Sequence, residues 1–394
     1  MSNADAKAVF DWLVDGARSA PDKATMLAQL CDRLVESGVP LWRVALLMFT
    51  LHPQIKGRSL RWKEGGDVEV RTGDFDYFAT SEHLASPFRV VLDSGVALRR
   101  ALLGELAADE FEVIRELKEQ GATDYLAVPL FFADGTTHCV TFTTRHPDGF
   151  SDRHLAALEA IAAPLARVVE AHALRRRAAT LLDTYVGAHA GSRVLDGQIR
   201  RGHTTAINAA IWLSDMRGFT RLADRLSPQT LIDRLNRYFD CQVPAILEHG
   251  GEVLKFMGDG LLAIFPIAEQ GGDARDVCDA ALAAARKARR EILHALAPAS
   301  ETSDGATPFG LALHVGQVLY GNIGAETRLD FTCIGPAVNL AARIEKLTAK
   351  LGRTVLASSE FARAATAGFV PLGAFDLPGF DEPRLVFGLE EEGP

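Results

Sequence analysis

Two carboxylates in glycine-rich surroundings are the residues of this sequence best suited to chemistry. Asp215 follows an apolar run in IWLSDMRGFT, and Asp259 lies within LKFMGDGLLAIF. Either aspartate alone is typical of an ordinary strand end or turn. Together they offer the hard oxygen ligands that hold two divalent cations, with coordination positions left for phosphate oxygens and water. The pair therefore indicates a metal-dependent phosphate site.

A flexible turn rich in backbone amides follows the first aspartate. Gly218, Phe219 and Thr220 come where a helix is expected to begin. The N–H groups at a helix N-terminus bind phosphate, and a glycine there lets a polyphosphate approach the backbone closely. We expect these three residues to contact the phosphates of a substrate.

Alternating strand and helix patterns surround the two aspartates from about residue 204 onward. This order predicts an α/β fold of the sandwich type in the C-terminal half. Glycine, proline and serine mark the element ends, with Ser227 as an N-cap and Gly258 in a hairpin turn. The expected strands cover 205–215, 252–266 as a hairpin, 309–324 and 330–335; the expected helices cover 227–251, 273–296 and 336–352.

The first part of the chain, residues 1–170, predicts a separate α/β domain. Asp134-Gly135 is a hairpin signal between two apolar runs, and Ser151 is a candidate N-cap for a long exit helix. Residues 171–203 predict a basic helical connector that breaks at Gly187 and Gly191. The other expected elements of the domain are a helix over 21–38, strands over 43–53 and 57–62, and hairpin strands over 125–132 and 138–147.

His138 and Cys139 are adjacent on one of these predicted strands. Haem binding or redox sensing is one interpretation of such a pair. Ordinary burial habits favour the other interpretation, a structural histidine beside a core cysteine.

Composition limits the classes of protein to consider. A chain of 394 residues with 48% hydrophobic and 24% charged residues predicts two globular domains. Its net charge of −9 argues against nucleic-acid or anionic-membrane partners. The five scattered cysteines lack CxxC spacing, so we expect reduced thiols rather than a zinc site or disulfides. Without a signal-like N-terminus or an apolar run of about 18 residues, we expect a cytoplasmic protein outside the membrane.

Three ordered sequence blocks resemble the signature of the class III nucleotidyl cyclase domain. They are DMRGFT, LKFMGDGLLAIF and RLDFTCIGPAVNLAARIE, and the resemblance covers residues 204–394. It implies a ferredoxin-like α+β fold for this half of the chain. The order of elements in residues 1–170 resembles a GAF-type sensor domain, which implies a regulatory role for an effector that the sequence does not name.

The cyclase resemblance implies roles for individual residues. Asp215 and Asp259 match the aspartates that bind two Mg²⁺ or Mn²⁺ ions, with the Met216 carbonyl as a further ligand. Asn339 matches the residue that orients the ribose. Arg343 matches the arginine that stabilises charge on the reacting phosphate. Spacing supports this last pair, because residues four apart lie on one face of a helix.

Two further positions match the residues that read the base. Lys255 carries a donor suited to adenine N1, and the Thr332 hydroxyl can accept from the adenine amine. Guanylyl members of the family usually carry Glu and Cys at these positions. We therefore expect ATP as substrate and cyclic AMP as product. The alternatives are a guanylyl or dual-specificity cyclase, or a catalytically weak nucleotide-binding module.

The resemblance also implies a homodimer with two shared sites, since one chain carries every required residue type. One position departs from the family pattern. Pro378, within FDLPGFDEPRL, stands where many members have a lysine that binds phosphate. Two alternatives follow: the protein binds the triphosphate more weakly, or another cation such as Arg384 substitutes for the lysine.

Overall fold

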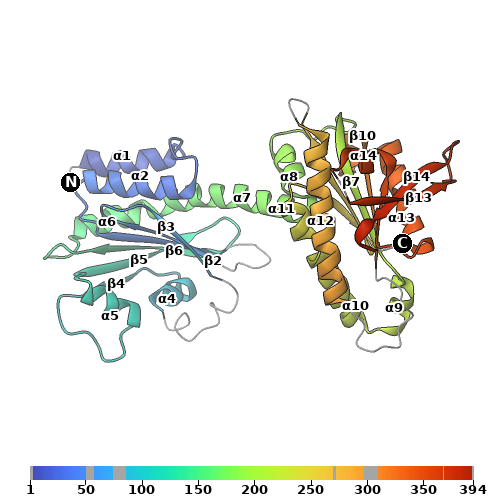
Figure 1. Ribbon diagram of the computed structural model, residues 1–394. Helices are drawn as coiled ribbons and strands as arrows, with labels where there is room; N and C mark the ends of the chain where they lie inside the picture. The colour runs from blue at the N-terminus through green and yellow to red at the C-terminus, as the bar shows by residue number, and fades with distance from the viewer. Residues whose placement is uncertain are drawn as a thin grey trace. The chain divides into compact units, whose positions relative to one another are not determined.

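The computed structural model describes residues 3–49, 57–73, 86–268, 272–296, 309–366 and 368–392. The chain divides into two compact units, Met1–Leu181 and Leu182–Pro394 (Figure 1). The division falls within helix α7, Ala162–Val186, and thus inside the range expected for the connector. Each unit has its own sheet and its own apolar core.

The N-terminal unit is built on a six-stranded sheet in the order β3-β2-β1-β6-β5-β4. Helices α1, α2, α6 and α7 pack on one face through the larger core cluster, and α4 and α5 pack on the other (Figure 1). Its elements are α1 (Asn3–Val14), α2 (Lys23–Glu36), β1 (Arg43–Phe49), β2 (Gly57–Lys63), β3 (Glu69–Gly73), α4 (Pro87–Ser94), β4 (Leu98–Ala101), α5 (Glu112–Glu119), β5 (Asp124–Phe131), β6 (Thr137–Thr144) and α6 (Asp152–Ala160), followed by α7.

Most of the elements expected in this unit are present. The β5–β6 hairpin turns at Asp134-Gly135, and the Ser151 hydroxyl caps α6 by accepting from the His154 N–H at 3.3 Å. The first expected strand corresponds to β1, while its last residues, 50–53, lie outside the described residues. The exit helix is divided at Ile161 into α6 and α7.

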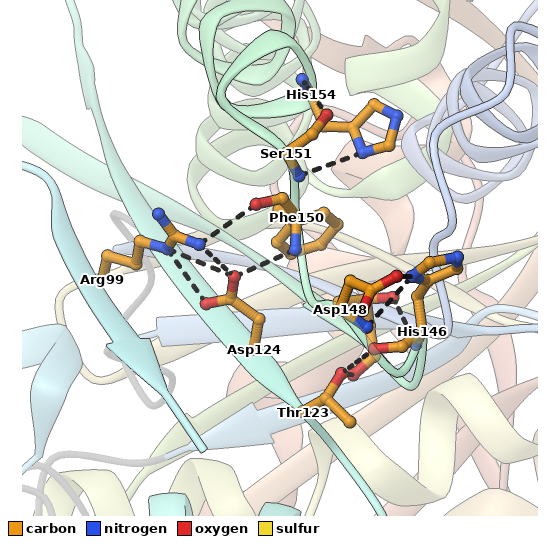
Figure 2. A network of polar contacts seen from close by, with 9 residues as sticks. Arg99, Thr123, Asp124, His146, Asp148, Phe150, Ser151 and His154 are labelled. Carbon is orange, nitrogen blue, oxygen red and sulfur yellow. Dashed lines mark hydrogen bonds and ion pairs between the residues drawn. The ribbon is translucent and has the colours of Figure 1, made fainter. Parts of the chain in front are cut away.

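An ion pair between the exposed Arg99 and the buried Asp124 ties the turn before the exit helix to the sheet (Figure 2). The Asp124 carboxylate, 1% exposed, accepts from Arg99 Nη2 at 2.6 Å and from the Phe150 N–H at 3.0 Å. Arg99 Nη2 also donates to the Phe150 carbonyl at 3.1 Å. Because both partners of the buried carboxylate are held in place, β4, β5 and the turn before α6 are fixed together.

The structure places His138 in the core of the unit, fully buried. Its Nδ1 accepts from the Phe49 N–H at 3.2 Å, and its Nε2 lies 3.1 Å from Thr136 Oγ1. Its ring centroid is 4.1 Å from that of Phe132. Both ring nitrogens thus have protein partners, which supports the structural interpretation of this histidine. Cys139 beside it is a buried free thiol, as are the other four cysteines.

Burial makes the stability of this unit sensitive to acid. Burial, and secondarily the charge of Arg177, lowers the pKa of His138 to about 4. The unfolded chain binds the proton more readily between that value and about 6.5, so stability falls as the pH falls through this window, by up to about 3 kcal/mol. Urea titrations followed by tryptophan fluorescence measure the effect.

His138→Gln is expected to flatten this dependence on pH, because glutamine does not titrate. The exposed His146→Gln is the matched control and keeps the wild-type slope. An equally steep slope in His138→Gln would mean that another group causes the acid sensitivity.

The C-terminal unit is built on an eight-stranded sheet in the order β13-β14-β12-β10-β7-β9-β8, with β11 paired to β10. Its mixed α/β architecture is the predicted fold class. Its elements are α8 (Ala188–Leu195), β7 (Thr204–Met216), α9 (Phe219–Arg225), α10 (Pro228–Asp240), α11 (Val243–Glu248), β8 (Glu252–Met257), β9 (Gly260–Ile267), α12 (Ala274–Ala295), β10 (Phe309–Ala325), β11 (Arg328–Ile334), α13 (Pro336–Lys350), β12 (Val355–Ser358), α14 (Ser359–Ala364), β13 (Phe369–Phe375), β14 (Arg384–Leu389) and a short 3₁₀ turn at Glu390–Glu392.

Each face of this sheet is covered by a different set of helices. Trp212 on β7 faces the core shared with α10, α11, α12 and α14. Ile211 and Leu213 point to the opposite face, where α8 and α13 pack. Because side chains alternate along a strand, Asp215 lies on the α13 face, in line with Ile211 and Leu213.

Two expectations for this unit are wrong. The single helix over 227–251 is two helices, α10 and α11, separated at Cys241 and Gln242. Pro244 explains the break, since proline lacks the N–H that a continuous helix requires and instead occupies the first turn of α11. Gly191 does not break the connector but lies inside α8, where an added Cβ would come within 3.0 Å of Leu182 Cβ. Gly187 does end α7, as expected.

Candidate active site

Asp215 and Asp259 meet where strand β7 ends and strand β9 begins. Asp215 is the penultimate residue of β7 and pairs with Gly310 of β10. Asp259 lies in the turn between β8 and β9, and β9 is the other neighbour of β7. Gly260 brings the turn close, since a Cβ there would lie 3.3 Å from Asp215 Oδ1. The sheet topology therefore places both carboxylates side by side.

Negative charge is concentrated around this pair. Burial raises the pKa of Asp215 well above its ordinary value, and the carboxylates of Asp259 and Glu345 raise it further. Burial also raises the pKa of Glu345 on α13, an effect that Arg217 opposes. Crowded carboxylates in a half-buried site are a setting in which a bound cation is favourable.

Glu345 is a member of this cluster that the sequence reasoning missed. Its carboxylate lies beneath the sheet edge, where an added Cβ on Gly310 would come within 2.7 Å of its Oε1. Glu345 follows Arg343 by two residues in the third sequence block, so its position in the block was visible. Its electrostatic effect on Asp215 was not, because this effect depends on how α13 crosses the sheet.

The turn after Asp215 has the form expected of a phosphate-binding segment. Gly218 has φ 70°, in the left-handed region that favours glycine, and α9 begins at Phe219. Phe219 packs against the core beneath the turn, while Thr220 is exposed. Met216 is the last residue of β7 and follows Asp215 directly, and its side chain is buried.

The two candidate base-reading residues lie on β8 and β11, two strands that approach each other. Lys255 is half-buried and pairs with Leu262 of β9, so it shares the α13 face of the sheet with Asp215. Burial raises the pKa of Cys333, the neighbour of Thr332, and the positive charge of Lys255 opposes this effect. Thr332 is 3% exposed, and its hydroxyl has no hydrogen-bond partner among the described residues. A buried hydroxyl without a partner is costly and is suited to a ligand.

Asn339 and Arg343 lie on another face of α13 than Glu345. Both lie on α13, four residues apart, and thus on one helical face. Glu345 faces the aspartate cluster, and at about 100° per residue it lies roughly 160° around the helix from Arg343. Asn339 is exposed and Arg343 half-buried. Arg343 is thus directed away from the face of α13 that bears Glu345.

Pro378, at the position of the absent lysine, is exposed after β13. Arg384 begins β14, and its guanidinium lies 5.4 Å from the ring centroid of Phe380. Its Nε is buried without a hydrogen-bond partner among the described residues. Arg384 thus keeps donor capacity for an anion.

Residues 203–377 match the family described as the Adenylate and Guanylate cyclase catalytic domain. This segment contains both aspartates, both candidate base-reading residues and α13. This part of the chain therefore belongs to the adenylate and guanylate cyclase catalytic domain family. The match begins at residue 203, so the GAF-like assignment of the N-terminal unit stays a prediction.

Individual relatives agree with this assignment. The chain is similar to "Adenylate cyclase 1" of Rhizobium meliloti, with 26% identity over 324 residues, 79% of this chain and 47% of the relative. It is also similar to an adenylate cyclase of Anabaena cylindrica, with 30% identity over 193 residues, 49% of this chain and 37% of the relative. The chain thus spans less than half the length of these relatives.

Among solved structures, the adenylyl cyclase CyaB from P. aeruginosa is similar, with 28% identity and a TM-score of 0.42 over 48% of this chain and 95% of that chain. Within the described residues, no helix has the length and apolar character needed to cross a membrane.

Proposed function

We propose that the chain is a cytoplasmic adenylate cyclase that converts ATP to 3′,5′-cyclic AMP and pyrophosphate. The observation that carries the proposal is the convergence of Asp215 and Asp259 at one sheet edge, on the face that also bears Lys255. Membership of residues 203–377 in the cyclase family supports the reaction type. The names of the two curated relatives favour ATP over GTP.

The aspartate cluster fits two divalent cations, Mg²⁺ or Mn²⁺. Its donors are carboxylate oxygens, with the Met216 carbonyl adjacent, and such oxygens are the ligands that these ions prefer. The mutual repulsion that raises the pKa of Asp215 is relieved when positive charge lies between Asp215 and Asp259. When bound, the cations supply a lowered pKa for the ribose 3′-OH and a counter-charge for the triphosphate.

The chain's own residues bind and orient the nucleotide. The N–H groups of Gly218, Phe219 and Thr220 hold phosphate oxygens at the start of α9. Asn339 orients the ribose for in-line attack of its 3′ oxygen on the α-phosphate. Arg343 donates to the α-phosphate oxygens and offsets the charge that develops there.

Lys255 and Thr332 select the base. The lysine ammonium donates to adenine N1, and the threonine hydroxyl accepts from the adenine amine. A hydroxyl can also rotate and donate to guanine O6. The unpartnered Thr332 hydroxyl therefore makes a dual-specificity cyclase the second candidate function. A module that holds nucleotide without turnover is less well supported, because the sequence retains both aspartates, Asn339 and Arg343.

Exchanging the two base-reading residues tests this function. In the double variant Lys255→Glu, Thr332→Cys we expect the ratio of ATP use to GTP use to fall by roughly 10²-fold, since the donor and acceptor pattern is inverted and the wrong base leaves buried groups unpaired. Product formation from each nucleotide is measured separately. Lys346→Glu is the control, because it makes the same change of charge at an exposed residue of α13. Equal losses with both nucleotides would remove base reading from these residues.

We propose further that the active unit is a homodimer with two shared sites. The support is that Glu345 interacts with the aspartate cluster, whereas Asn339 and Arg343 lie on another face of α13. A two-fold symmetric partner would supply that face to the opposite site. Each site then contains the metal residues of one subunit and Asn339 and Arg343 of the other.

Regulation by the N-terminal domain would act through the connector. In the C-terminal unit, an added Cβ on Gly187, between α7 and α8, would lie 3.2 Å from the Val253 carbonyl of β8. Ala190 of α8 packs in one core cluster with Leu254, the neighbour of Lys255. A shift of the connector therefore displaces the strand that carries the proposed base-reading lysine. The effector, a small molecule or a protein, would favour one position of this connector.

A further inference from the structure

A cavity lined by cations lies in the N-terminal unit, on the face of the sheet that α2 and α7 cover. Its volume is about 610 Å³, which is in the range of small-molecule sites. Its walls are the start of α2, strands β1 and β2, and the part of α7 before Leu181. All the residues known to line it belong to this one unit.

Among the described residues that line this cavity, cations outnumber carboxylates. Asp22 is the carboxylate among its described lining residues, and its Oδ1 is engaged as the cap of α2, accepting from the backbone of Ala24 at 2.8 Å and Thr25 at 3.0 Å. One of the cations, Arg177, forms an ion pair at 3.1 Å with Asp134, a residue that does not line the cavity. The cationic side chains that line the cavity are Lys23, Arg58, Arg175, Arg176 and Arg177.

Lys23 shows the effect of this imbalance most clearly. Its Nζ lies 3.7 Å from the thioether of Met48, a weak acceptor. Burial, followed by the charges of Arg58, Arg176 and Arg177, lowers the pKa of Lys23 to about 8. The ammonium is therefore held among other cations without a carboxylate partner in the described part of the chain.

The cavity also offers an apolar surface next to the cations. Met48 and Leu60 of the sheet contribute to its wall. His172, Arg176 and Thr180 come from α7 at intervals of four residues, so one helical face is directed toward the cavity. A bound molecule would thus touch α2, the sheet and α7 at once.

We propose that this cavity binds a small organic phosphate, with its phosphate among Lys23, Arg58 and Arg176 and its apolar part against Met48 and Leu60. Guanidinium groups hold phosphate through paired N–H donors. The volume leaves room for a body larger than the phosphate itself. Binding neutralises a cluster of cations that otherwise repel one another.

Occupancy of the cavity would fix α7 against α2 and β2. The same helix continues past Leu181 to Val186, where the connector to the catalytic unit begins. The ligand is therefore assigned as the effector of the N-terminal domain. This regulatory consequence rests on the proposed cyclase function, whereas binding at the cavity does not.

Binding is tested on the full chain by calorimetry with phenyl phosphate and with inorganic phosphate as probes. EDTA in the buffer removes divalent cations from the aspartate cluster. We expect saturable binding of phenyl phosphate, tighter than that of inorganic phosphate because the ring adds apolar contact. Arg58→Gln and Arg176→Gln should each weaken it about tenfold, the effect of losing one charged hydrogen bond. Arg153→Gln, an exposed change on α6, is the control.

Lys23→Met gives an independent signature. Methionine has a flexible side chain of similar length and removes an unpaired cation, so we expect the Tm without ligand to rise and the ligand-induced increase in Tm to be lost. A merely structural lysine would give a lower Tm. Equal affinity in wild type, Arg58→Gln and Arg176→Gln, or equal affinity for the two probes, would overturn the proposed site.

The regulatory consequence has a separate readout. In the presence of divalent cations, phenyl phosphate should change the rate of cyclic nucleotide formation by wild type and not by Arg176→Gln. Binding without any change in rate would overturn the effector role but would still support the proposed binding site. A chain without cyclase activity would instead contradict the proposed function, and the calorimetric result would still decide whether the cavity binds organic phosphate.

Discussion

Asp215→Ala and Asp259→Ala each reduce cyclic nucleotide formation by roughly 10³-fold or more, because each removes a carboxylate that would hold the divalent cations. Loss of such a ligand would affect activation of the ribose 3′-OH and neutralisation of the triphosphate. The fold should survive, since either substitution removes charge from a crowded cluster. Circular dichroism and steady-state rates with Mg²⁺ or Mn²⁺ measure the two effects separately.

Asp224→Ala is the matched control, an exposed aspartate on α9 close in sequence to Asp215. It should keep the wild-type rate. Metal should also raise the Tm of wild type and leave that of the two aspartate variants unchanged, because a ligand that binds only the folded state stabilises it. Undiminished turnover in either aspartate variant would refute the two-metal assignment.

Mixing two inactive variants is expected to restore activity. Asp215→Ala lacks a metal ligand and Arg343→Ala lacks the group that stabilises the reacting phosphate, so each homodimer is inactive. In a mixed dimer one site receives both defects and the other receives none. Random exchange makes half of the dimers mixed, with one intact site of two, so recovery should approach roughly a quarter of the wild-type rate.

The control for this mixture is a pair of variants with defects on the same side of the site. Asp215→Ala mixed with Asp259→Ala should stay inactive, because every mixed dimer then has one metal defect in each site. Subunit exchange is verified with differently tagged chains. If exchange is complete and the first mixture remains inactive, the site lies within a single chain and the shared-site proposal is wrong.

The sequence was sufficient to predict features set by short stretches of chain. Hairpins at Asp134 and Asp259 follow from turn residues between apolar runs, and Ser151 caps its helix as expected. The convergence of Asp215 and Asp259 was also expected, because each lies at a strand end in a recognisable block. Local residue chemistry decided these features.

Features that depend on contacts between distant elements were missed. Glu345 joins the aspartates only because α13 crosses the sheet beneath Gly310. The cavity in the N-terminal unit combines Lys23, Arg58 and Arg176 from three elements, and no short stretch of sequence displays that combination. The break before Pro244 was missed for a different reason: an amphipathic pattern continued through it and concealed a local signal.

The identity of the product is the most direct test of the account. The purified full chain is incubated with equimolar ATP and GTP and with Mg²⁺ or Mn²⁺, and the nucleotides formed are identified by mass spectrometry. The account predicts 3′,5′-cyclic AMP and pyrophosphate as the main products, with formation abolished by EDTA and by Asp259→Ala. Cyclic GMP as the main product would contradict the base assignment, and the absence of any cyclic nucleotide under these conditions would contradict the proposed function itself.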